Sequence, residues 1–202
     1  MEFGETARAC QTSNVREVTM KLIQSQTTRD INVARTLFRE YQRFLGVDLC
    51  FQGFEEELAT LPGRYAPPRG RLLLALDGSR AAGCVALRPL DDRICEMKRL
   101  FVRPAYRGRG LGRVLATRIV NEASALGYAA MRLDTLEGLE GAMHIYTSMG
   151  FQRCAPYYAN PLPGVVYWER VLSSSPSAYV AVEPQRPPLG QIGDARFNHR
   201  RW

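Results

Sequence analysis

Hydrophobic positions recur along this chain with two different periods, which predict an alternation of strands and helices. Apolar runs and period-two patterns predict seven strands, over residues 18–24, 71–77, 81–90, 96–102, 129–134, 151–156 and 165–172. Helical spacing predicts four helices, from an N-cap at Asp30 to about Gly46 and over residues 54–61, 111–126 and 138–149. The order is therefore one strand, two helices, three strands, one helix, one strand, one helix and two strands.

Turn residues indicate how some of these strands pair. Gly78-Ser79 and Asp91-Asp92 connect the three strands between residues 71 and 102, which favours an antiparallel meander. The last two strands flank residues 157–164 and are expected to form a closing hairpin. Residues 1–17 are polar and residues 173–202 are rich in Ser and Pro, so both are expected to be flexible segments around one domain over residues 18–172.

The stretch from Glu96 to Leu126 combines an apolar strand, a proline at position 104, a glycine-rich loop and an amphipathic helix. Glycines let backbone N–H groups converge, and the first turn of a helix leaves further N–H groups unpaired. This arrangement predicts an anion site suited to a phosphate or pyrophosphate. A dinucleotide fingerprint does not fit, because Arg113 stands where its third glycine belongs, and the Lys-Ser/Thr of a Walker loop is missing.

Charge supports a polyanionic ligand at the same place. The chain has 27 basic and 20 acidic residues, a net charge of +7. Seven basic residues and no acidic one lie between Met97 and Arg118. Nucleic acid would also fit this charge, but Phe101 and Tyr106 are the only aromatic residues nearby, which gives no stacking platform and disfavours it.

Composition narrows the remaining classes. The sequence contains no run of about 18 apolar residues, so no membrane span is predicted. The N-terminal residues also carry no apolar stretch of signal-peptide type, so a cytoplasmic protein is expected. The five cysteines form no C-x-x-C pair, and only His144 and His199 are present, so no metal site is expected. Cys84 and Cys95 are expected to be buried thiols. A nucleophilic cysteine would need His144 as its partner.

Two motifs resemble those of a known family. Arg107-x-x-Gly110-x-Gly112 resembles the acyl-CoA-binding motif of the GNAT superfamily of N-acyltransferases, and Ala142-x-x-x-Tyr146-x-x-x-Gly150-Phe151 resembles the family's last helix and its exit. The resemblance covers about residues 18–172 and includes the order of the elements. It implies a GNAT fold of the α/β (α+β) class, a mixed and mostly antiparallel sheet of about seven strands flanked by about four helices.

The resemblance also implies a reaction and a set of site residues. The reaction would be direct transfer of an acetyl group from acetyl-CoA to a primary amine of a small molecule or peptide. Glu96 would be the general base and Tyr146 the general acid at the CoA sulfur. The cofactor would be bound by backbone groups of the strand, by the glycine-rich loop, and by Thr135 and Tyr146; these strand and loop residues are Leu100, Phe101, Val102, Arg107, Gly108, Arg109, Gly110, Leu111 and Gly112.

Several alternatives stay open. Period two places Glu96, Lys98 and Leu100 on one face of the strand and Met97, Arg99 and Phe101 on the other. Glu96 could instead be a solvated residue at a strand start, and Tyr146 a core aromatic. Leu139 occupies the position where relatives often have a CoA-contacting asparagine, so Thr135 is the substitute contact.

Residues 48–52 and the loop Tyr157–Pro161 would form the amine pocket, or Tyr157 and Tyr158 could simply pack the closing hairpin. Rival functions are a non-catalytic acyl-CoA-binding sensor module and a basic nucleic-acid-binding protein. The acceptor, the acyl chain length and the formation of a homodimer are not determined by the sequence.

Overall fold

A computed structural model of the chain describes residues 20–172. The seven strands and four helices occur in the predicted order. Their bounds are β1 Met20–Gln24, α1 Thr28–Leu45, α2 Phe54–Thr60, β2 Arg71–Asp77, β3 Arg80–Pro89, β4 Ile94–Val102, α3 Leu111–Ala125, β5 Ala130–Leu136, α4 Glu140–Ser148, β6 Gln152–Cys154 and β7 Val165–Val171. The expected flexible segments 1–17 and 173–202 lie outside the described residues.

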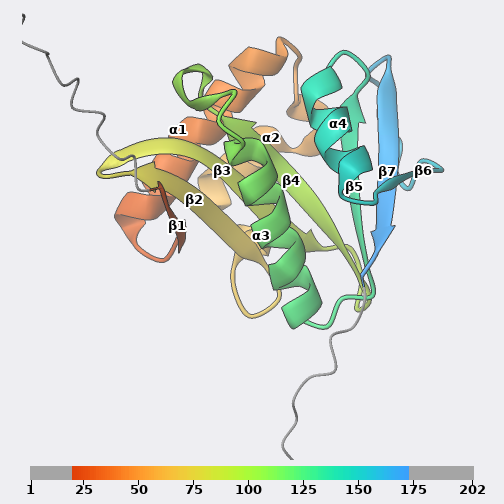
Figure 1. Ribbon diagram of the computed structural model, residues 1–202, viewed down its shortest axis with the longest axis horizontal. Coiled ribbons are helices and arrows are strands. Elements are labelled where there is room, and N and C mark those ends of the chain that lie inside the picture. Colours follow the sequence, from red (N-terminus) through yellow and green to blue (C-terminus); the bar gives the residue numbers. More distant parts are fainter. Residues whose placement is uncertain (1–19, 173–202) are drawn as a thin grey trace, which may run out of the picture.

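The strands form one mixed sheet in the order β1-β2-β3-β4-β5-β7-β6 (Figure 1). Neighbouring strands are antiparallel except for β4 and β5, which run parallel. This parallel pairing is short and ends at the Glu96–Arg132 pair. Beyond Glu96, β4 and β5 therefore separate, and the predicted fold of a mixed, mostly antiparallel sheet is confirmed.

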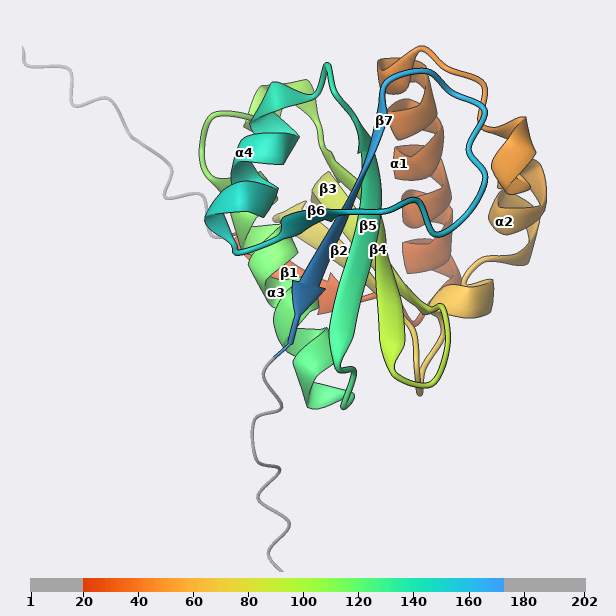
Figure 2. The ribbon, with the colours of Figure 1, turned by 90° about the vertical axis from the view of Figure 1, so that its right-hand side faces the viewer.

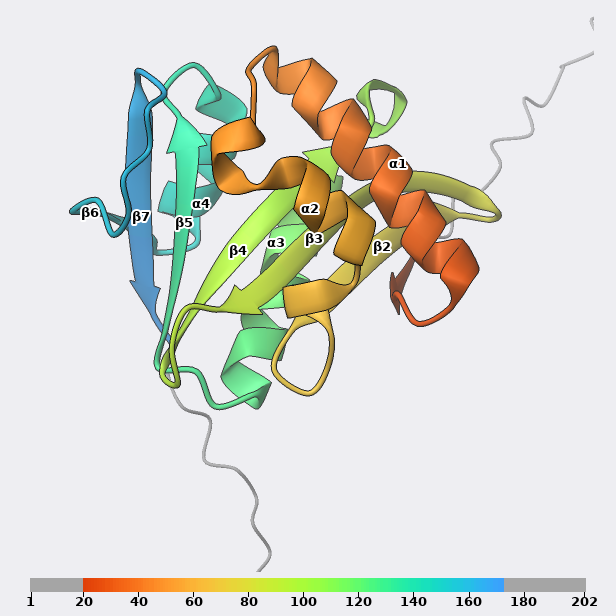
Figure 3. The same ribbon diagram turned by 180° about the vertical axis from the view of Figure 1, so that it is seen from behind.

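Helices cover both faces of the sheet (Figures 2 and 3). Helices α3 and α4 lie on one face, and α1 and α2 lie on the other. Each face has its own apolar core because successive strand residues point to opposite sides. In β2, Leu73 and Ala75 pack on the α3 side, whereas Leu72 and Leu74 pack on the α1 side.

The start of α1 differs from the prediction. Thr27, and not Asp30, is the N-cap: its Oγ1 accepts the Asp30 N–H at 3.2 Å, and the Asp30 carboxylate accepts the Thr27 N–H at 3.1 Å. This reciprocal arrangement is a capping box, in which the acidic residue lies three positions after the cap. The apolar face of α1 packs on the sheet, with Ala34, Leu37 and Phe38 fully buried.

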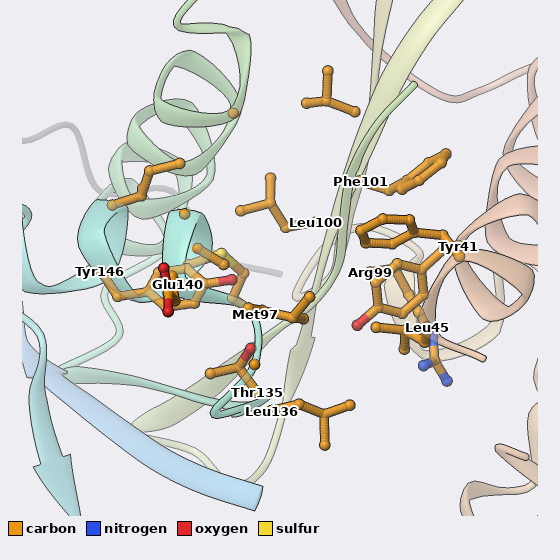
Figure 4. A pocket seen from close by; sticks show the side chains of 18 of the residues that line it. Tyr41, Leu45, Met97, Arg99, Leu100, Phe101, Thr135, Leu136, Glu140 and Tyr146 are labelled. Atoms are coloured by element: carbon orange, nitrogen blue, oxygen red, sulfur yellow. The ribbon is translucent and has the colours of Figure 1, made fainter. Parts of the chain in front are cut away.

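A bulge in β4 overturns the predicted faces of that strand. Phe101 pairs with Cys84 and Lys98 pairs with Ala86, so Arg99 and Leu100 both lie opposite Val85. Arg99 has a positive φ of 57°, which accommodates the extra residue. Figure 4 shows the result: Leu100 lies on the side of Tyr146, while Arg99 and Phe101 lie on the side of Tyr41. Leu100 therefore does not share a face with Glu96 and Lys98.

Candidate active site

A cavity of about 730 Å³ occupies the gap that opens between β4 and β5. Its walls come from the end of α1, the bulged part of β4, the glycine-rich loop, the ends of β5 and the start of α4. Residues on both faces of β4 line it, so the cavity connects the two sides of the sheet (Figure 4). Ten of the eleven predicted cofactor-binding residues line this cavity: Leu100, Phe101, Val102, Arg107, Gly108, Gly110, Leu111, Gly112, Thr135 and Tyr146.

The glycine-rich loop directs the start of α3 toward the cavity. Gly108 and Gly110 have φ values of 74° and 76°, in the left-handed region where a side chain is strained. The first helical hydrogen bond runs from the Val114 N–H to the Gly110 carbonyl. The N–H groups of Leu111, Gly112 and Arg113 therefore have no helical acceptor, and the positive end of the helix dipole is there.

The arginines of the loop have different surroundings. Arg107 Nε donates to the Val102 carbonyl at 2.9 Å, and its guanidinium lies 4.1 Å from the centroid of the Phe44 ring. Arg113 lines the cavity and donates to the Ser148 hydroxyl at 2.6 Å. Arg109 is not among the residues that line the cavity. Positive charge in the part of the cavity next to the glycine-rich loop thus comes from Arg107, Arg113 and the N-terminus of α3.

Tyr146 is both a core aromatic residue and a residue of the cavity wall, the two roles that its sequence position allowed. Its side chain is only 6% exposed and its ring packs against Phe151 and Trp168, as expected of a core aromatic. It also lines the cavity from α4. Burial, reinforced by Tyr41 and Asp134, raises the pKa of the Tyr146 hydroxyl, which therefore keeps its proton at neutral pH.

Glu96 lies deeper than the sequence suggested. It is fully buried, so the alternative of a solvated glutamate is wrong, and it is not one of the residues that line the cavity. Arg88 Nε donates to its Oε2 at 2.6 Å and the Tyr157 hydroxyl donates to its Oε1 at 2.8 Å. Lys98 Nζ is 3.8 Å from the same Oε1 and does line the cavity. A base role for Glu96 stays a prediction.

Two carboxylates do line the cavity, Glu140 of α4 and Asp134 near the end of β5, and no sequence motif pointed to either. Asp134 Oδ1 accepts a hydrogen bond from Lys98 Nζ at 2.9 Å, and its Oδ2 accepts one from the Tyr158 hydroxyl at 2.8 Å. Burial opposes ionisation of Asp134, but Lys98 and Tyr158 outweigh it and hold its pKa below the ordinary value. Asp134 is therefore ionised at neutral pH.

The segments expected to form the amine pocket contribute unequally. Leu49 and Asn160 line the cavity, whereas Tyr157 and Tyr158 do not. These two tyrosines pack against each other and against Tyr167, as the alternative of hairpin packing predicted. The segment between β6 and β7 that carries them crosses to the face covered by α1 and α2 (Figure 2). Through their hydroxyls they also orient the carboxylates of Glu96 and Asp134.

Other expectations concern metals, thiols and membranes. Within residues 20–172, no three His, Cys, Asp or Glu side chains are grouped to hold a metal ion. Cys84 and Cys95 are buried free thiols, as predicted. Among the helices of the described part of the chain, none is long and apolar enough to cross a membrane.

Comparison with known proteins gives the class. Residues 34–151 match the model of the acetyltransferase (GNAT) family. An uncharacterized N-acetyltransferase of Schizosaccharomyces pombe is 44% identical over 147 residues, which cover 72% of this chain and 90% of the relative. An uncharacterized N-acetyltransferase of Dictyostelium discoideum is 31% identical over 192 residues, covering 65% and 89%. The family match and these relatives thus define an acyltransferase enzyme, and the chain belongs to the GNAT acetyltransferase family.

Solved structures agree on the fold. An acetyltransferase from Streptococcus agalactiae has a TM-score of 0.65 at 22% identity and covers 76% of this chain and 98% of its own. A Salmonella typhimurium protein that was solved with its cofactor acetyl-CoA has a TM-score of 0.60 at 17% identity, covering 76% and 94%. The general reaction of the chain is acetyl transfer, and the rival function of a non-catalytic sensor module is not favoured.

Proposed function

We propose that this enzyme transfers an acetyl group from acetyl-CoA to a primary amine, by direct attack while both substrates are bound. The observation that carries the proposal is the cavity between β4 and β5, which connects the two faces of the sheet. One face, with α3 and α4, is here called the cofactor side; the other, with α1 and α2, is called the acceptor side. Two substrates that enter from opposite sides would meet in the gap.

The residues on the cofactor side fit acetyl-CoA. The N-terminus of α3, with Arg107 and Arg113 beside it, offers backbone donors and positive charge of the kind that binds a pyrophosphate. The apolar side chains of Met97, Leu100 and Ile145 line the cavity beyond it and suit an extended chain. When bound, acetyl-CoA supplies an activated acetyl thioester.

The chain's own groups then have three tasks. Beyond Glu96, backbone N–H groups of β4 that point away from β3 have no β5 partner, so they can bind the carbonyl oxygen of the acetyl group. Tyr146, protonated at neutral pH, is the proton donor to the leaving sulfur. The attacking amine must lose a proton, which for a lysine-like amine of pKa about 10.4 costs roughly 4.6 kcal/mol at pH 7.

Glu96 is the proposed proton acceptor, acting from behind the cavity wall. Glu96 lies close behind the wall, because its Oε1 is 3.8 Å from the Nζ of Lys98, a residue that lines the cavity. A proton released by the amine would pass to Glu96 through a water. General base help of this kind contributes about 10²–10⁴-fold to rate.

The test has two stages with the full chain. Thermal unfolding is first measured with acetyl-CoA, CoA and longer acyl-CoAs, and acetyl-CoA is expected to give a concentration-dependent rise in Tm. Free thiol is then followed with a panel of primary amines, and its release is expected to depend on the amine. A stronger response to longer acyl-CoAs would overturn the donor, and amine-independent thiol release would overturn direct transfer to an amine.

A further inference from the structure

The chain's two lysines are Lys21 and Lys98, although it has 27 basic residues. Lys21 is exposed on β1, at the edge of the sheet. Lys98 is in the cavity wall, with a side chain only 6% exposed. A buried ammonium in a wall is costly to desolvate, so its presence calls for a partner or a role.

The partner is Asp134, whose side chain is 11% exposed and also lines the cavity. The two residues face the acceptor side, joined by the 2.9 Å contact between Lys98 Nζ and Asp134 Oδ1. Within the described residues, Asp134 is the one acceptor within hydrogen-bond distance of Lys98 Nζ, since Glu96 Oε1 is 3.8 Å away. An ammonium has three donors, so Lys98 retains capacity for a further acceptor.

Charged side chains behind and in this wall of the cavity are paired. Arg99 is paired with Glu57 at 2.6 Å, Arg88 with Glu96 at 2.6 Å, and Lys98 with Asp134. Among the described residues that line the cavity on this side, Asp134 is the one carboxylate, and it is already paired, so none is left in excess to attract a polycation. Glu140, the other acidic lining residue, lies beside Tyr146 on the cofactor side (Figure 4).

The paired charges of Lys98 and Asp134 would discriminate among amine acceptors by the other charged group that each acceptor carries. An acceptor with only an ammonium group would be attracted by Asp134 but would place a second cation beside Lys98. Two like charges in contact repel each other, and more strongly in a partly buried site than in water. An acceptor that also carries a carboxylate would satisfy both members of the pair at once.

We propose that Lys98 and Asp134 form the binding site for a zwitterionic acceptor, an α-amino acid or a close analogue. Asp134 binds the amine and Lys98 binds the neighbouring carboxylate. This inference rests on the proposed function and names its substrate class. Asn160 also lines the cavity beside Asp134, its Nδ2 lying 3.0 Å from the Tyr158 hydroxyl and 3.5 Å from Asp134 Oδ2, and so fixes the geometry of the pair.

The experiment compares matched acceptors with acetyl-CoA as donor. The twenty L-amino acids are tested against their carboxamides, which keep the amine and the side chain but lack the anionic group. The best amino acid is expected to show a kcat/KM at least tenfold above that of its carboxamide. Carboxamides have the more easily deprotonated amine, so simple reactivity would favour them, and a preference for the acid must arise from binding.

Variants assign the preference to Lys98. Lys98→Met is expected to lower kcat/KM for the amino acid at least tenfold and to change that for the carboxamide less than threefold. The Tm shift caused by acetyl-CoA should be unaltered. Lys98→Arg should retain the preference, because it keeps the charge. Lys21→Met is the matched control, and it should behave as the unmodified protein.

The outcomes separate the two claims. Carboxamides that equal or exceed the amino acids would overturn the zwitterion site and leave the proposed function standing. Acetyl-CoA binding without acetylation of any amine would overturn the proposed function itself. If Lys98→Met fails to fold, calorimetric titration of the best amino acid and its carboxamide into the unmodified protein with CoA decides: equal binding contradicts the proposal.

Discussion

The two sides of β4 are built in different ways. On the cofactor side, binding groups are backbone N–H groups presented by Gly108, Gly110 and the first turn of α3, all within one short stretch of sequence. On the acceptor side, the groups are charged side chains paired over long separations, such as Lys98 with Asp134 and Arg99 with Glu57. A backbone site depends on conformation, whereas a site of paired charges depends on every partner being present.

The largest effect is expected where backbone conformation and charge act together. Gly110→Asp places a strained side chain at φ 76° and a negative charge at the N-terminus of α3. Affinity for acetyl-CoA should fall more than 100-fold, measured by calorimetric titration. Gly78→Asp is the control, because Gly78 also has a positive φ of 58° but lies in the β2–β3 turn. Retained binding in Gly110→Asp would contradict the assignment of the loop.

Glu96→Gln tests whether the buried carboxylate transfers protons or only supports the fold. Loss of a general base should lower kcat about 100-fold or more, with acetyl-CoA affinity unchanged. Activity is measured by thiol release and affinity by titration. Glu40→Gln is the control, since Glu40 is also paired with an arginine, Arg103, but does not line the cavity. A less stable protein with normal kcat would make Glu96 a structural residue.

Tyr146→Phe keeps the ring packing on Phe151 and Trp168 and removes only the hydroxyl. If that hydroxyl protonates the leaving sulfur, kcat should fall about 10- to 100-fold while the Kd for CoA stays within about twofold. Single-turnover kinetics would locate the change in the chemical step. An unchanged kcat would assign Tyr146 to the core alone.

Stability should depend on the charge pairs of the acceptor side. Glu57→Gln leaves Arg99, whose side chain is 2% exposed, without its carboxylate, and should cost about 3 kcal/mol in urea unfolding. The matched control is Glu55→Gln, because Glu55 lies on the same helix and pairs with Arg39 at the exposed surface. Equal losses in the two variants would contradict the view that burial makes the pair important.

The pair of Glu57 and Arg99 should also make the stability of the protein depend on pH. Burial raises the pKa of Glu57, but Arg99 and Tyr65 outweigh it and hold the pKa below its ordinary value. A depressed folded-state pKa adds stability above the unfolded pKa of about 4.3, and this stability is lost as pH falls through the folded pKa. The difference in unfolding free energy between the unmodified protein and Glu57→Gln should therefore become smaller at acidic pH. Urea unfolding at about pH 7, 4 and 3 measures it, since the window lies below the unfolded pKa.

Much of the cofactor side could be predicted from the sequence because its signals are local. The bounds of β2, the start of α3 and the glycine-rich loop follow from apolar periodicity and turn residues, and the structure confirms them. Asp30 was wrong as an N-cap because Thr27, three residues earlier, forms the capping box with it. Either residue type is a good cap, so the sequence alone did not separate them.

The acceptor side could not be predicted because its interactions are not local. Lys98 and Asp134 are 36 residues apart, and no spacing rule connects them. An aspartate at the end of the apolar run before Thr135 was the only signal for that site. Likewise, the deep burial of Glu96 depends on Arg88 and Tyr157, which arrive from another strand and from the β6–β7 segment.

The bulge at Arg99 restricts which insertions and deletions the sequence of β4 can accept. Because one extra residue reverses the side-chain alternation, deleting any residue between Lys98 and Val102 would exchange the side chains offered to the two faces. Leu100 or Phe101 would then point to the wrong substrate. A single substitution in β4 changes one side chain of the cavity wall. A one-residue insertion or deletion changes the side chains that line the cavity on both faces of the sheet. The length of this strand is therefore expected to be more constrained than the identity of its residues.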